Sequence, residues 1–273
     1  MARKGFSQSQ VAFRKKASAK TTKQDYDRAR DMGYQLRSLV PHLPFEVLSH
    51  PASFVDPRPD LAYIRKAAND IRRRMDLADE VVRFSDIIAF YEEVNAVLVP
   101  VMWGKKDNHE NALHIYLPDS LTTWVYLNLD VKVMDFKFWM AHELAHVKAP
   151  GLSDEQGEEF ADAFASELLF PHQIAARYLP ALENASSPGA IVNRIQGIAA
   201  DFVVSPVTVL TQINQAAAER GDPTIAIDIH PSTTNFNKQF RDIDEIIFGT
   251  NRASAAQYIS RCTEAFRTPF FHA

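Results

Sequence analysis

The sequence is poor in the residues that several common protein classes require. One cysteine, Cys262, permits no internal disulfide and no zinc site built from several thiolates. Only nine glycines are present, and neither GxGxxG nor GxxxxGK[ST] occurs, which excludes glycine-rich phosphate loops. No run approaches the roughly 18 apolar residues of a membrane span, and the first residues lack the apolar core of a secretory signal. We therefore expect a cytoplasmic globular protein with no membrane partner.

Charge is distributed unevenly along the chain. Residues 1–74 hold 16 lysines and arginines against 7 acidic residues, whereas residues 75–273 hold 14 against 27. Residues 1–24 contain seven basic residues and no acidic one, and five prolines follow between residues 41 and 59. We interpret residues 1–60 as a basic arm and a proline-rich linker, because proline does not continue a helix. Such a basic region is typical of a segment that contacts a partner.

The remainder of the chain predicts an α+β fold that is mainly helical. Apolar, β-prone runs at 96–102, 113–117 and 124–129 indicate a small sheet of about three strands. Helices are predicted at the ranges 25–40, 61–75, 85–91, 135–149, 154–169, 188–202 and 206–218. We assign residues 61–220 to one catalytic-type domain. Residues 221–273 form a C-terminal extension of irregular, mixed composition.

The informative motif is His142-Glu143-Leu144-Ala145-His146, an HExxH pattern inside a long apolar helix. Residues i and i+4 lie on one face of a helix, so the two imidazoles can share one zinc ion. Glu143 lies beside them and can act as the general base without binding the metal. We therefore predict His142 and His146 as metal ligands and Glu143 as the catalytic residue.

A catalytic zinc site needs a third protein ligand. The metzincin pattern is excluded, because Ala149 and Leu152 stand where that pattern has glycine and histidine. The next helix offers Glu158, twelve residues after His146, with Asp162 on the same helix face. We predict that Glu158 binds the metal and that Asp162 hydrogen-bonds a ligand histidine. Glu155 and Glu159 are the alternative ligands.

These two helices resemble a known family. HELAH followed by EEFADAFASELLFP is similar to the HExxH and ExxA(N/D)xFAxxLLxP segments of the ImmA/IrrE metallopeptidases. The resemblance extends over about residues 60–215 and implies a gluzincin-like zinc endopeptidase. Its substrate would be a helix-turn-helix transcriptional repressor, whose cleavage derepresses prophage, stress-response or defence genes. The alternative is a non-proteolytic regulatory protein that binds a repressor or DNA through its basic N-terminal region.

Other roles are predicted from residue type alone. His172, Tyr126 and His114 are candidates for stabilising the oxyanion, and the strand at 124–129 is a candidate edge for pairing with an extended substrate. Nucleic acid is a further candidate partner, through the run Arg72-Arg73-Arg74. Cys262 is interpreted as a plain thiol, with an inhibitory zinc ligand as the alternative. Residues 198–214 look like half of a helix-turn-helix, but they carry no basic face, so we interpret them as structural.

Overall fold

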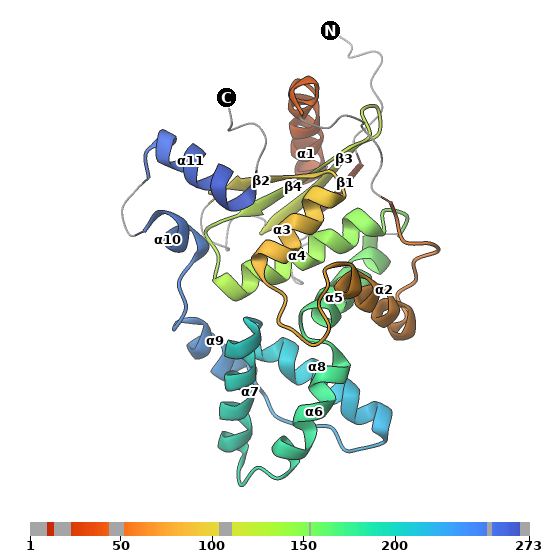
Figure 1. The fold of residues 1–273 in the computed structure, drawn as a ribbon, viewed down its shortest axis with the longest axis vertical. Coiled ribbons are helices and arrows are strands. Elements are labelled where there is room, and N and C mark those ends of the chain that lie inside the picture. Colours follow the sequence, from red (N-terminus) through yellow and green to blue (C-terminus); the bar gives the residue numbers. More distant parts are fainter. Residues whose placement is uncertain are drawn as a thin grey trace.

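The computed structural model describes residues 10–13, 23–43, 52–103, 111–152, 154–249 and 253–267. Within these ranges a small sheet lies against a larger helical body (Figure 1). The predicted fold class, α+β and mainly helical, is confirmed. Most of the basic arm and part of the proline-rich linker lie outside the described residues.

The sheet contains the three predicted strands, β2 (Ala96–Val101), β3 (Ala112–Leu117) and β4 (Thr122–Asn128). A fourth strand, β1 (Gln10–Phe13), comes from the segment that the sequence assigned to the basic arm. The strand order is β1-β3-β4-β2, with β2 parallel to β4 and β3 antiparallel to both of its neighbours. β1 and β2 are therefore the two edges of the sheet.

One face of the sheet packs against α4 (Val133–Lys148) and α3 (Phe84–Glu93). α4 is buried on nearly every side, which explains why its sequence is apolar throughout and not amphipathic. α5 (Asp154–Leu169) runs back along α4 after the turn at Pro150 and Gly151, and α2 (Leu61–Arg74) packs on α5. The sheet thus positions α4, and α4 in turn positions α5.

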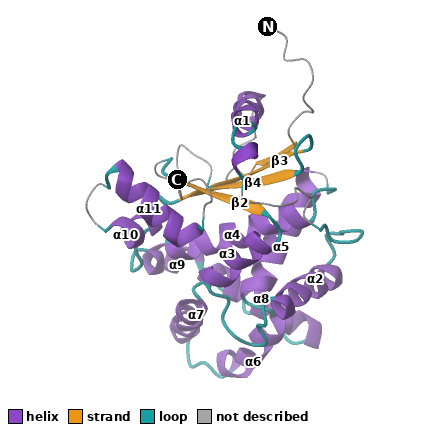
Figure 2. Ribbon diagram, turned by 45° about the horizontal axis from the view of Figure 1, so that its top comes forward, coloured by secondary structure: helices purple, strands orange, loops and turns teal. Residues whose placement is uncertain are grey.

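The opposite face of the sheet is covered by α1 (Lys23–Leu36) and the short 3-10 turn Val40–His42, as Figure 2 shows for α1. Leu36 packs there in a second hydrophobic cluster with Val97, Leu113, Ile115, Leu117 and Trp124. The guanidinium of Arg37 makes two hydrogen bonds to Asp119, of 2.7 and 2.8 Å, in the turn between β3 and β4. The N-terminal region is therefore built onto the sheet through β1 and α1.

Three helices continue the chain below α5: α6 (His172–Glu183), α7 (Pro188–Phe202) and α8 (Pro206–Arg220). Ser187 and Ser205 cap α7 and α8 through their side chains, and each helix begins with proline, a favoured first residue. The face of α8 that contains Val209, Gln212 and Ile213 is buried. This burial agrees with the structural interpretation of residues 198–214.

The C-terminal extension is more ordered than its composition indicates, with α9 (His230–Asn237), α10 (Ile243–Phe248) and α11 (Ala255–Phe266). It is attached at Lys132, whose ammonium lies 2.8 Å from the carboxylate of Asp242, and the backbone N–H of Ile243 donates to Val131. In α11, the ring of Phe266 packs on Phe136 of α4. Among the described residues, no helix is long and apolar enough to cross a membrane.

Candidate metal centre

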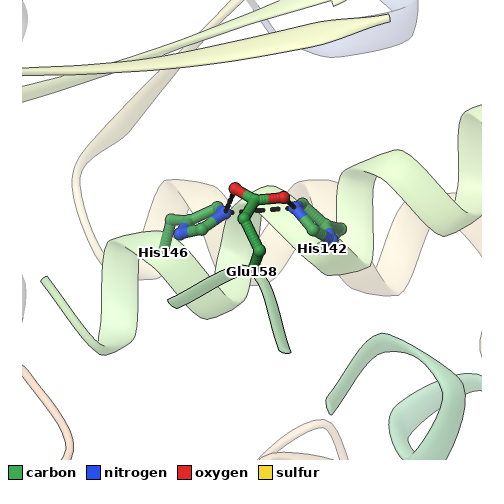
Figure 3. A group of neighbouring side chains, drawn as sticks. All are labelled: His142, His146 and Glu158. Atoms are coloured by element: carbon green, nitrogen blue, oxygen red, sulfur yellow. Dashed lines mark hydrogen bonds and ion pairs between the residues drawn. The ribbon is translucent and has the colours of Figure 1, made fainter. Parts of the chain in front are cut away.

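The C-terminal half of α4 places two imidazoles side by side on one helix face (Figure 3). The Nε2 atoms of His142 and His146 are 3.0 Å apart. His142 is fully buried and the side chain of His146 is only 10% exposed. The spacing of one helical turn brings the rings together, as the sequence predicts.

The third side chain of the group comes from α5. The carboxylate of Glu158 approaches both imidazoles, at 3.6 Å from Nε2 of His142 and 3.2 Å from Nε2 of His146. Glu155 and Glu159 are both exposed to solvent and lie outside the group. Of the three alternatives considered from the sequence, the structure therefore brings Glu158 to the histidines.

The donor atoms of these three side chains have the spacing of a metal site. The two Nε2 atoms are 3.0 Å apart, and the Glu158 oxygen nearest to each lies 3.2 Å from His146 and 3.6 Å from His142. These distances are close to the edge of about 3.3 Å of a tetrahedron whose metal–ligand bonds are about 2.0–2.1 Å. Two neutral imidazoles and one carboxylate also fit a divalent cation chemically. Among the described residues, His142, His146 and Glu158 are the group of histidine, cysteine and acidic side chains close enough to share an ion.

Asp162 lies one helical turn after Glu158 and contacts the far side of a ligand ring. Its Oδ1 is 3.0 Å from Nδ1 of His142. A carboxylate at this atom holds the proton on Nδ1 and leaves the lone pair of Nε2 directed toward Glu158. The predicted partner of the ligand histidine is thus in contact with it.

Glu143, on α4, is buried, with 1% of its surface exposed. Burial raises the pKa of the Tyr91 phenol well above its ordinary value, and the charge of Glu143 raises it further. Tyr91 donates to the carbonyl of Met140 at 2.7 Å, which ties α3 to the helical turn that precedes Glu143. The sequence predicts only that Tyr91 lies on a helix, because its contact with α4 depends on tertiary packing.

Residues 98–214 match the family model Peptidase_M78, described as the IrrE N-terminal-like domain. The match begins in β2, ends in α8 and includes all three residues of the metal group. This region of the chain is therefore similar to the M78 peptidase family. This confirms the resemblance to the ImmA/IrrE family that the two-helix motif indicates. A comparison with curated proteins found no match.

The structure places the three candidates for oxyanion stabilisation in different parts of the fold. Tyr126 belongs to the hydrophobic cluster under α1, stacks on Trp103 and has its pKa raised by burial to about 12. It therefore lies on the face of the sheet opposite α4, and its predicted role is wrong. Strand residues alternate between the two faces of a sheet. The role predicted for Tyr126 therefore required its side chain to lie on the face that α4 covers.

His172 also lies away from the metal group. Its Nδ1 and its backbone N–H contact Glu167, near the end of α5. Glu158 precedes Glu167 by nine residues, or about 14 Å along the helix axis. The Nε2 atom of His172 lies 4.0 Å from the carboxylate of Glu219. Both contacts hold His172 far from the metal group, so its predicted role in stabilising the oxyanion is also wrong.

His114 is the oxyanion candidate that lies on the correct face of the sheet. Leu113, Ile115 and Leu117 point toward α1, whereas Ala112 packs in the core that contains α4. By alternation, His114 shares the face of Ala112. It is buried, with 6% of its surface exposed, and its role in catalysis stays a prediction.

The predicted substrate edge at 124–129 is wrong. β4 is an interior strand, hydrogen-bonded to β3 on one side and β2 on the other. A strand whose two sides are paired has no free backbone groups for an added peptide.

Cys262 does not join the metal group of the described residues. It is fully buried in α11. Burial raises the pKa of its thiol to about 11, despite a hydrogen bond from Tyr258 that lowers it. Because Cys262 lies outside the group formed by His142, His146 and Glu158, the alternative of an inhibitory zinc ligand is wrong, and the plain thiol agrees with the structure.

The arginine run divides into one structural residue and two surface residues. Arg72 is 2% exposed and donates to the carbonyls of Leu168, Ala78 and Glu80 at 2.8, 3.0 and 2.6 Å. Its predicted contact with nucleic acid is therefore wrong, because the buried guanidinium is hydrogen-bonded to backbone carbonyls of the protein itself. Arg73 and Arg74 are exposed and form ion pairs with Asp70 and Glu93.

Proposed function

We propose that this protein is a zinc-dependent endopeptidase of the cytoplasm. The observation that supports this most directly is the cluster of His142, His146 and Glu158, with Glu143 on the helix that carries both histidines. Three protein ligands are the set typical of a catalytic zinc, which keeps its fourth position for water or substrate. When bound, zinc supplies a Lewis acid that polarises the scissile carbonyl and acidifies water.

The remaining steps of catalysis are assigned to side chains of the protein. Asp162 holds His142 in the tautomer that offers Nε2 to the metal. Glu143 accepts the proton of the attacking water and then delivers it to the leaving amine. His114 is our candidate for stabilising the developing oxyanion.

We further propose that the substrate is a helix-turn-helix repressor, whose cleavage derepresses prophage, stress-response or defence genes. The resemblance to the ImmA/IrrE family supports this choice. The obvious repressor to test is a small one encoded next to this gene.

A metal measurement tests the site. The purified chain should bind one zinc per molecule, measured by mass spectrometry of the metal. Glu158→Gln should bind it at least 10-fold more weakly, because one charged ligand is lost. Glu159→Gln is the matched control, since this neighbouring acid is exposed, and it should bind zinc normally. Equal loss in both variants would contradict the ligand assignment.

A second experiment tests proteolysis. Glu143→Gln should keep its zinc and lose cleavage of the co-expressed repressor, because the amide accepts no proton. Repressor fragments are followed by mass spectrometry and repression by a reporter gene. If Glu143→Gln relieves repression fully while the repressor stays intact, the chain is instead a regulatory protein that acts by binding.

A further inference from the structure

The edge of the sheet beside β3 is occupied by a segment of the chain's own N-terminal region. β1 pairs antiparallel with β3 in the register Gln10 with Tyr116, Val11 with Ile115, Ala12 with His114 and Phe13 with Leu113. The family match begins at residue 98. The strand on this edge therefore comes from outside the matched peptidase region.

The other edge of the sheet is unsuited to an added strand. β2 contains Pro100, which has no N–H to donate. The carbonyl of the same residue accepts a hydrogen bond from the hydroxyl of Tyr258 in α11. Without β1, the edge of β3 would present backbone donors and acceptors with no proline among Ala112–Leu117, which is the pattern that accepts an extended peptide.

The edge of β3 is also the one associated with the metal group. α4, which carries both histidines, packs against β3 and β4. In Figure 3, strands of the sheet lie above the side chains of the group. Ala12 of β1 is the register partner of His114, which shares the face of β3 that is turned toward α4. An extended peptide on this edge would therefore run next to the centre.

We propose that β1 occupies the edge of β3 along which an extended substrate pairs, so that residues 10–13 compete with substrate inside the same chain. This inference rests on the proposed peptidase function. Backbone pairing in a ladder is largely independent of sequence, so one edge fits both the internal segment and a substrate strand. A site that is occupied internally nine-tenths of the time binds an external peptide about tenfold more weakly.

The alternation of an antiparallel ladder provides a specific test. Of any two adjacent residues in β1, one directs its N–H toward β3 and the other directs it outward. Proline removes this donor and is tolerated on an edge strand where the N–H points outward. Among full-length variants Val11→Pro and Ala12→Pro, one should therefore release β1, and the other is its matched control.

The probe is a fluorescein-labelled peptide with the sequence of residues 7–16, SQSQVAFRKK. It is titrated by fluorescence anisotropy into full-length chains that carry Glu143→Gln, so that the peptide is not cut. The releasing variant should bind the peptide about tenfold more tightly than the parent chain, and the control proline variant should match the parent. Circular dichroism and thermal unfolding check that both variants keep the fold.

A second variant covers the case in which a proline disturbs more than β1. Val11→Gly with Ala12→Gly weakens the strand without constraining its backbone, and it should also bind the peptide more tightly than the parent. Equal peptide binding by the parent, both proline variants and the glycine variant would overturn the proposal.

The outcome is separable from that of the proposed function. Peptide binding to the Glu143→Gln background requires no hydrolysis. If the releasing variant binds the peptide but no preparation cuts the repressor, the peptidase proposal fails and competition for the edge stands. If the repressor is cut but neither the proline variants nor the glycine variant binds the peptide more tightly than the parent, competition by β1 is wrong.

Discussion

Oδ1 of Asp162 lies 3.0 Å from Nδ1 of His142, so a carboxylate on α5 fixes the ring of a metal ligand on α4. The same helix supplies Glu158 one turn earlier. α5 therefore contributes one direct ligand and one support for a second ligand, and the packing of α4 on α5 sets both contacts.

This relationship predicts that Asp162 controls metal affinity. Asp162→Ala should weaken zinc binding 10- to 100-fold, because the ring of His142 loses the partner that orients it. Asp162→Asn should bind zinc more nearly like the parent, since its amide oxygen can still accept from Nδ1. Asp201→Ala, on the exposed side of α7, is the control. Competition with a fluorescent zinc chelator measures all three, and normal affinity in Asp162→Ala would contradict the assignment.

The two faces of the sheet predict opposite results for His114 and Tyr126. His114→Leu, which removes the donor, should lower kcat about 100-fold or more if the imidazole stabilises the oxyanion. Tyr126→Phe should leave kcat unchanged, because its hydroxyl lies on the face covered by α1. Steady-state kinetics on the cut repressor tests both. An unchanged kcat in His114→Leu would exclude the last of the three candidates for oxyanion stabilisation.

The helices were the most predictable part of the fold, because their boundaries are encoded locally. Asp154–Leu169 and Pro188–Phe202 match the predicted ranges, since proline and serine at their ends stop or cap them. The spacing of His142, His146 and Glu158 was equally local, because it depends on helical geometry and one turn.

What could not be predicted depends on contacts between distant segments. Gln10–Phe13 is a four-residue strand in a basic, polar stretch, and it becomes recognisable only through pairing with β3. Tyr126 and His114 both lie on strands, and alternation alone does not tell which face meets α4. Two helices of the C-terminal extension did carry local signals that the prediction from sequence missed, since α10 and α11 each begin with a capping box, Asp242 with Glu245 and Ser254 with Gln257.

Arg72 and Arg73 are adjacent in sequence but should differ sharply in their effect on stability. Arg72→Met should lower the free energy of unfolding by about 3 kcal/mol, because three carbonyls lose a charged donor in a buried place. Arg73→Ala should change it by less than about 0.5 kcal/mol, as for an exposed residue. Urea denaturation followed by circular dichroism measures both. Equal effects would contradict the structural role of Arg72.

Cys262 should be unreactive in the folded chain. Its thiol is buried and its pKa is raised to about 11, so little thiolate exists at pH 8. Labelling by an excess of iodoacetamide should be slow in buffer and rapid in 6 M urea, as followed by mass spectrometry. Cys262→Ala should keep the zinc content of the parent. Fast labelling of the native chain, or altered zinc content in Cys262→Ala, would count against a purely structural thiol.

The burial of Lys137 should make the free energy of unfolding depend on pH. It is buried in α4, and its ammonium donates to the carbonyl of Phe202 at 2.7 Å. Burial lowers its pKa from 10.5 to about 8. Between these two values the unfolded chain keeps a proton that the folded chain has released, so stability rises with pH. Below pH 8 both states hold the proton and the contribution of this residue is constant.

The expected rise is about 2 kcal/mol between pH 8 and pH 10, since each unit of pKa difference corresponds to about 1.4 kcal/mol. Lys137→Met should lack this rise relative to the parent. Lys66→Met, at an exposed lysine on α2, should keep it. Urea denaturation at pH 8, 9 and 10, with a chelator in every sample to remove any contribution of bound metal, measures the three curves. If the free energy of unfolding changed with pH in the same way for the parent and Lys137→Met, burial would not lower the pKa of Lys137.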